Sequence, residues 1–156
     1  MTLESFNAAP EPQAAAEMLA CCASRRFAAA MAAGRPYPSQ EAALAAVEAV
    51  FESLAWPDVL EAMDAHPRIG ARVSGHSAAE QAGVADDSRA ALLAGNAAYE
   101  ERFGHVFLIC ATGLTGAQML AALRQRLEND ESSERVVAAA ELRKITVLRV
   151  RKALAG

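Results

Sequence analysis

The run that begins at Ser39 constrains the fold more than any other segment of the chain. It reads SQEAALAAVEAVFESLA, and Leu44, Val47, Phe51 and Leu54 recur at intervals of three or four residues. This spacing places the apolar side chains along one face of an α-helix, because a helix has 3.6 residues per turn. We therefore expect an amphipathic helix whose N-cap is Ser39.

Alanine extends this helical tendency to the rest of the chain. It supplies 39 of the 156 residues, whereas aromatic residues make up only 5%. Small side chains of high helix propensity favour closely packed helices over sheets lined with bulky residues. A chain of this length can also bury one hydrophobic core without disulfides or metal. We predict an all-α, single-domain bundle of seven to eight helices over residues 1–156.

Helix caps and the Gly and Pro breaks give the approximate limits of the other helices. The expected ranges are 10–24, 24–33, 56–64, 86–103, 115–127 and 132–154, with a further short helix between Gly75 and Gly83 and a short helical turn at 2–6.

One segment does not fit the helical pattern. Residues 105–111 read HVFLICA and are rich in β-branched and aromatic side chains, yet no second strand is evident to pair with them. Buried backbone N–H and C=O groups need partners, so this extended segment has hydrogen-bonding groups that a ligand could take.

Charge and cysteine content exclude several classes of partner. The formal net charge is −4 and the isoelectric point about 5.4, so the chain has no overall basic field for nucleic acid or an anionic membrane. Its three cysteines include the adjacent Cys21 and Cys22 and form no C-x-x-C pair, which fits small buried residues in a reducing compartment. The N-terminus lacks the pattern of a signal peptide and no segment is apolar enough for a membrane span, so we expect a soluble, cytoplasmic protein.

His66 is the first candidate for chemistry. It precedes Pro67, whose ring disfavours the α conformation in the preceding residue, so His66 should stand just past the end of a helix. The helix dipole favours a protonated imidazole at that point. From these residues alone, His66 is either a helix cap or a catalyst.

Two further polar groups allow both a structural and a ligand-binding interpretation. Ser77 and Glu80 have the spacing of a capping box, but Glu80 beside Gln81 would also offer a carboxylate and an amide to a ligand rich in N–H and C=O groups. Arg149 falls on an apolar helix face and needs an anionic partner, because a buried unpaired guanidinium is costly. The candidates for that partner are Glu80, Glu141 and a substrate carboxylate.

Two other functions fit parts of the same pattern. His66, His76 and Glu80 could bind zinc in a metal-dependent hydrolase acting on a ureide, although the chain has no H-E-x-x-H motif. The Ala-rich helical faces could instead belong to a binding module without enzymatic activity.

Several landmarks together resemble one family over nearly the whole chain. They are HPRIG from His66, SAAEQAG from Ser77, NAAYEERFGHVFLICATG from Asn96 and AAAELRKITVLRV from Ala138. In their order and spacing they closely resemble the 2-oxo-4-hydroxy-4-carboxy-5-ureidoimidazoline (OHCU) decarboxylases. The resemblance implies an all-helical homodimer that uses no metal or organic cofactor. It also implies decarboxylation of OHCU to (S)-allantoin, the last step from urate to allantoin.

The resemblance also implies roles for individual residues. His66 matches the family's catalytic histidine. The positions that match its substrate-binding residues are Pro67, Ser77, Glu80, Gln81, Ile109 and Arg149.

Overall fold

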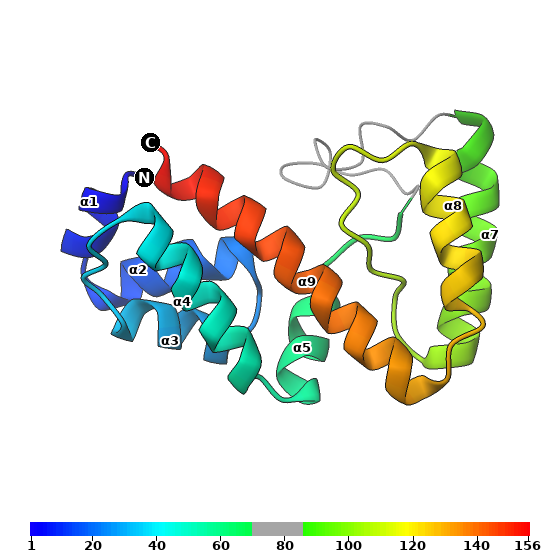
Figure 1. Ribbon diagram of the computed structural model, residues 1–156, viewed down its shortest axis with the longest axis horizontal. Coiled ribbons are helices and arrows are strands. Elements are labelled where there is room, and N and C mark those ends of the chain that lie inside the picture. Colours follow the sequence, from blue (N-terminus) through cyan, green and yellow to red (C-terminus); the bar gives the residue numbers. More distant parts are fainter. Residues whose placement is uncertain (70–85) are drawn as a thin grey trace. The chain divides into compact units, whose positions relative to one another are not determined.

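A computed structural model describes residues 1–69 and 86–156 (Figure 1). Eight α-helices lie in this part of the chain, and no strand is found there. The helices are α1 (Leu3–Ala8), α2 (Glu11–Cys21), α3 (Arg25–Ala33), α4 (Gln40–Ser53), α5 (Trp56–Met63), α7 (Asp86–Phe103), α8 (Gly116–Arg126) and α9 (Glu131–Leu154). The all-α prediction is confirmed. The short helix expected between Gly75 and Gly83 lies outside the described residues.

Side-chain caps set the starts of several helices where the sequence predicts them. The hydroxyl oxygens of Thr2, Ser24, Ser39 and Thr115 each accept a hydrogen bond from a backbone N–H of the following turn. Such bonds satisfy N–H groups that have no partner within the helix. The expected start at Ser39 is therefore confirmed.

The end of α2 is the clearest difference from the predicted limits. The sequence predicts a helix that ends close to Ser24, whereas α2 ends at Cys21 and Cys22 is extended, with φ −152° and ψ 116°. The reason is that the Ser24 hydroxyl accepts from the N–H of Phe27, at 3.2 Å, and so caps α3 instead of continuing α2.

The chain divides into two compact units, and each is described by itself. The first comprises residues 1–62 and 142–156, and the second comprises residues 63–141. In the first unit α2 packs against α3, and α3 packs against α4. An isolated antiparallel bridge between Thr2 and Ala155 joins the two ends of the chain in this unit (Figure 1).

The second unit is built around the packing of α7 against α8, which run side by side (Figure 1). The chain between these helices contains residues 106–111, which form neither helix nor strand. They lie outside the helical pattern, as the sequence predicts, and their extended conformation stays a prediction. The core cluster of the second unit consists of Ile69, Leu92, Tyr99, Phe107, Ile109, Ala111, Met119 and Leu123.

Candidate active site

His66 stands directly after α5, as the proline that follows it predicts. Its backbone N–H donates to the carbonyl of Met63 at 3.0 Å, which closes the last turn of the helix. The His66 side chain is partly buried, and so is that of Pro67. The structure confirms the predicted position at a helix end, while the catalytic role stays a prediction.

Helix α7 holds the residues that follow Pro67. The guanidinium of Arg68 donates to both carboxylate oxygens of Glu100, at 2.7 and 3.0 Å. The side-chain amide of Asn96, which is fully buried, donates to the carbonyl of Ile69 at 3.0 Å. Ile69 is itself buried in the core cluster. These three contacts fix the chain immediately after His66.

The extended segment, which follows α7 in the chain, contributes to the same core. Phe107, Ile109 and Ala111 belong to the cluster that contains Ile69. Outside the helices, none of the backbone–backbone hydrogen bonds in the described residues involves 106–109. The chain near Pro67 and the segment around Ile109 therefore share one core, and this segment is not part of a sheet.

Three backbone groups of the extended segment nevertheless have side-chain partners. Arg126 Nη1 donates to the carbonyl of Leu108 at 2.5 Å, and the N–H of Cys110 donates to Glu141 Oε1 at 3.1 Å. The carbonyl oxygen of Val106 lies 3.1 Å from Nδ1 of His105. The sequence predicts that this segment offers its backbone to a ligand. The carbonyl of Leu108 and the N–H of Cys110, on either side of Ile109, already have protein partners. The prediction therefore no longer applies to these two groups.

Arg149 lies in the first unit, on the apolar face of α9 where the sequence predicts it. It is only 8% exposed, and Leu142 and Val150 nearby on the helix are fully buried. Its Nη1 lies 3.5 Å from the carbonyl oxygen of Cys21. A buried cation held on an apolar face is well suited to an anionic or carbonyl oxygen.

The other predicted substrate-binding residues, Ser77, Glu80 and Gln81, lie outside the described residues, as does His76. Of the residues singled out from the sequence, the structure thus brings His66, Pro67 and Ile109 into one unit and describes Arg149 within the other. Among the described residues no three His, Cys, Asp or Glu side chains gather as metal ligands.

Sequence reasoning missed the side chains that support this site. Asn96, Arg126 and Glu134 are polar, yet each is less than 9% exposed. Asn96 falls within the quoted NAAYEERFG landmark but was not assigned a role. No motif or periodic pattern marks Arg126 or Glu134, since their partners lie on other elements.

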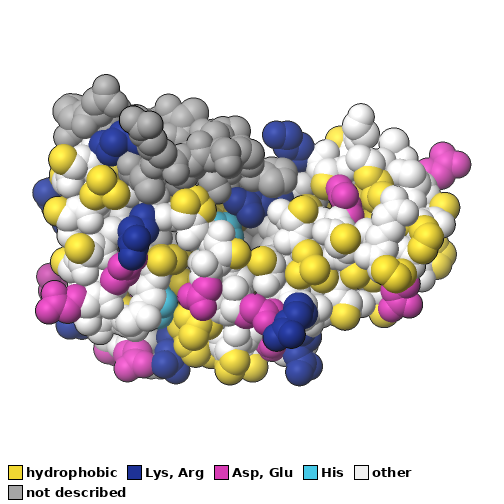
Figure 2. All heavy atoms as spheres, turned by 180° about the vertical axis from the view of Figure 1, so that it is seen from behind, with side chains coloured by type: hydrophobic (Ala, Val, Ile, Leu, Met, Phe, Trp, Pro, Cys, Tyr) yellow, Lys and Arg dark blue, Asp and Glu magenta, His cyan; other side chains and the backbone are white. Residues whose placement is uncertain are grey.

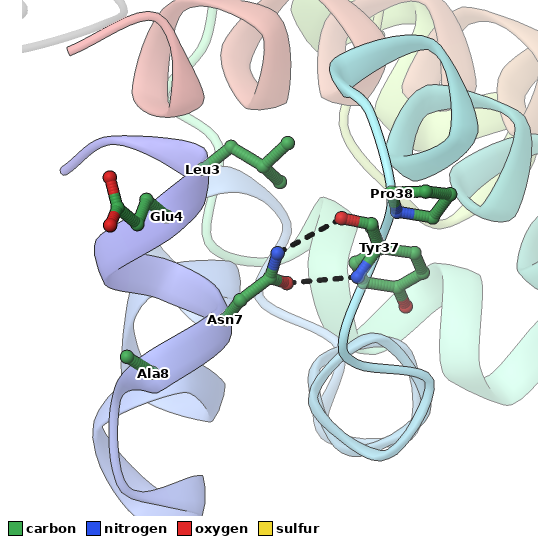
Figure 3. Close-up of a pocket in the computed structure, with 6 residues that line it drawn as sticks. All are labelled: Leu3, Glu4, Asn7, Ala8, Tyr37 and Pro38. Carbon is green, nitrogen blue, oxygen red and sulfur yellow. Dashed lines mark hydrogen bonds between the residues drawn. The ribbon is translucent and has the colours of Figure 1, made fainter.

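A hollow on the first unit contains none of the predicted site residues. Its lining consists of Leu3, Glu4, Asn7, Ala8, Tyr37 and Pro38 (Figure 3). The Asn7 side chain both donates to the carbonyl of Tyr37 and accepts from its N–H, each at 2.9 Å. These two bonds fix the Asn7 side chain against the backbone of Tyr37.

The surface carries charges of both signs. Figure 2 shows acidic and basic side chains interspersed among apolar ones on the face drawn. Within residues 1–69 and 86–156, no helix combines the length and the apolar character needed to cross a bilayer.

Taken together, the described residues form a small all-helical fold in which Ile69, three residues after His66, and Ile109 share one core. The model of the OHCU decarboxylase family matches residues 7–151, and the chain belongs to this family.

Two curated relatives are similar in sequence. The uric acid degradation bifunctional protein TTL of Arabidopsis thaliana is 38% identical, over 87% of this chain and 46% of that protein. The chain thus spans about half the length of the Arabidopsis protein. The 2-oxo-4-hydroxy-4-carboxy-5-ureidoimidazoline decarboxylase of Amia calva is 33% identical, over 79% of this chain and 77% of that protein.

Two solved structures are similar in fold. A crystal structure of OHCU decarboxylase in the presence of (S)-allantoin superposes with a TM-score of 0.80 at 38% identity and covers 90% of this chain and 98% of its own. A crystal structure of (S)-allantoin synthase has a TM-score of 0.72 at 20% identity, covering 99% of this chain and 54% of its own, and is similar in fold.

Proposed function

We propose that this chain decarboxylates OHCU to (S)-allantoin, the last step from urate to allantoin, and that it does so without a metal or organic cofactor. The observation that carries the proposal is the family match over residues 7–151. It favours this reaction over a metal-dependent ureide hydrolase and over a binding module. We also propose that the protein is a cytoplasmic homodimer, as the family resemblance and the sequence suggest.

The chemistry of OHCU explains how such a site could work without a cofactor. The ring carbon that carries the carboxylate also carries a hydroxyl and adjoins a C=N bond. When the bond to the carboxylate breaks, CO2 leaves and the electron pair moves into the C=N system, so the substrate is its own electron sink. The ring nitrogen of the former C=N bond takes a proton from solvent. The hydroxyl loses its proton to become the carbonyl, and the neighbouring carbon that bears the ureido group gains one.

The matched residues divide these tasks among them. His66 would take the hydroxyl proton and deliver a proton to one face of the carbon, which is general acid–base work worth roughly 10²- to 10⁴-fold in rate. Glu80 and Gln81 would hold the ureido and ring amides in one orientation.

The remaining matched residues would contact the substrate without exchanging protons. Arg149 would stabilise an anionic or carbonyl oxygen. The backbone of Ile109 would read a ring amide. Pro67 and Ser77 would complete the contacts with the substrate.

The decisive assay follows OHCU, generated in situ from urate, by circular dichroism. The proposal predicts rapid formation of (S)-allantoin, before and after exhaustive dialysis against a chelator. Racemic allantoin formed at the spontaneous rate would contradict it. Activity that disappears on chelation and returns with zinc would favour the hydrolase alternative instead.

Paired histidine variants test the role of His66. His66→Ala should lower kcat by roughly 10²- to 10⁴-fold, because the proton carrier is lost while the fold is kept. His76→Ala is the matched control and should keep its activity, since only the metal alternative uses that side chain. Wild-type turnover by a folded His66→Ala protein would remove His66 from the mechanism.

A further inference from the structure

A buried ion pair lies next to the extended segment in the second unit. Arg126 and Glu134 are 6% and 0% exposed, and Arg126 Nη2 lies 2.6 Å from Glu134 Oε1. The same carboxylate accepts from the Tyr99 hydroxyl at 2.6 Å and from the Asn129 amide at 3.0 Å. Burial and the bond to Glu134 raise the pKa of Tyr99, so its hydroxyl stays a donor. Glu134 is therefore surrounded by donors and holds Arg126 in place.

Such a pair needs an explanation other than stability. The cost of removing two charges from water is often as large as their attraction, so well-packed apolar residues could replace a buried pair with little loss. Arg126 has a further contact, since Nη1 donates to the carbonyl of Leu108 at 2.5 Å. Its guanidinium also lies 4.5 Å from the centre of the Phe107 ring. The pair thus fixes a buried cation against the extended segment.

A second side chain fixes the segment two residues further on. Glu141 Oε1 accepts from the N–H of Cys110 at 3.1 Å. If the segment has the extended conformation that the sequence predicts, the backbone groups of alternate residues point to the same edge, and the bonds to Leu108 and Cys110 lie along one edge. The N–H and C=O of Ile109, the residue between them, then point to the opposite edge.

We propose that Arg126, held by Glu134, and Glu141 are positioning residues that present the Ile109 backbone to the substrate. This inference rests on the proposed function. In a sheet, a neighbouring strand would bond to the backbone groups on one edge of the segment. Here the side chains of Arg126 and Glu141 make those bonds, and the Ile109 backbone on the other edge is left for the ring amides of OHCU. Because misplacement of a binding group by about 1 Å can cost roughly 10²-fold in rate, a fixed segment would matter for catalysis as well as binding.

The double variant Arg126→Met/Glu134→Gln separates positioning from stability. It leaves no unpaired buried charge, keeps an acceptor for the Tyr99 hydroxyl and removes the donor to Leu108. We expect a folded protein whose kcat/KM for OHCU falls by roughly 10²-fold, with a raised KM and more racemic allantoin. Arg135→Met/Glu131→Gln is the matched control, because it makes the same change in an exposed pair on α9, and it should keep the wild-type kcat, KM and stereoselectivity.

A second pair of variants tests the bond between Glu141 and Cys110. It also tests the proposal if the Arg126→Met/Glu134→Gln protein does not fold. Glu141→Gln keeps an oxygen acceptor for Cys110 and should retain a near-wild-type KM, whereas Glu141→Leu removes it and should raise KM roughly tenfold or more. A folded Glu141→Leu protein with wild-type KM and stereoselectivity would overturn the positioning role. A wild-type chain that does not act on OHCU in the same assay would overturn the proposed function itself, so the two failures are distinct.

Discussion

The cysteine thiols next to Arg149 show how burial alters the chemistry of a single residue. Burial raises the pKa of Cys21 from 9.0 to about 12, and it also raises that of Cys22. At neutral pH both thiols are protonated and poorly nucleophilic. This agrees with the interpretation of these residues from the sequence as small buried side chains.

A pH dependence of stability follows from the Cys21 thiol. Above pH 9.0 the unfolded chain loses this proton while the folded chain keeps it up to about pH 12. The folded state therefore binds more protons in this range, and its stability falls as the pH rises, by up to about 1.4 kcal/mol per pH unit for one group. Below pH 9.0 the contribution is fully present.

Urea unfolding of the wild type and of Cys21→Ala at a series of pH values above 9.0 measures this contribution. The variant should lose stability less steeply with pH, whatever its stability at neutral pH. Parallel curves for the two proteins would show that Cys21 does not titrate differently in the folded and unfolded states.

At the scale of the elements, the contact between α7 and α8 depends on a residue without a side chain. A Cβ placed on Gly95 would lie 2.7 Å from Cδ2 and 3.2 Å from Cδ1 of Leu123, which is 1% exposed. Because Leu123 is enclosed by the core, it has little room to move away. Gly95 therefore allows the two helices to approach closely.

Gly95→Ala should destabilise the protein by about 1–3 kcal/mol through overpacking. In an open helix the same change would instead stabilise by roughly 0.5–1 kcal/mol. A double-mutant cycle in urea with Leu123→Ala tests this, since the smaller side chain makes room and the methyl group added by Gly95→Ala should then be tolerated. Equal effects of Gly95→Ala in both backgrounds would mean that the clash with Leu123 does not matter.

The elements also show which parts of the structure the sequence could predict. Helix starts depend on a hydroxyl and the next turn of the same chain, so Ser39 and Thr115 were recognisable as caps. The position of His66 was predictable for the same reason, because Pro67 acts on its direct neighbour. The end of α2 was not, since Ser24 serves the following helix.

The side-chain contacts that hold the candidate site in place could not be predicted from local sequence patterns. Arg126 and Glu134 lie on different helices and bond to each other, and Arg126 also donates to a carbonyl 18 residues before it in the chain. Neither helix periodicity nor a spacing motif records such a contact. The family resemblance identified Ile109, but only the structure shows what holds the backbone on either side of it.

At the scale of the whole molecule, the residues that the resemblance groups together come from distant parts of the chain. His66 and Ile109 belong to the unit formed by residues 63–141, whereas Arg149 belongs to the unit formed by the two ends of the chain. A substitution in either unit should therefore be judged by its effect on kinetics as well as on folding.

The proposed homodimer is the prediction that belongs to this scale. Light scattering after size-exclusion chromatography should give twice the 16.4 kDa mass of the chain. If folding is coupled to association, mass action also requires the Tm to rise with protein concentration. A mass of one chain at micromolar concentration, with a Tm that does not depend on concentration, would contradict the dimer. Undiminished OHCU turnover by that single chain would further show that one subunit supplies every group the reaction needs.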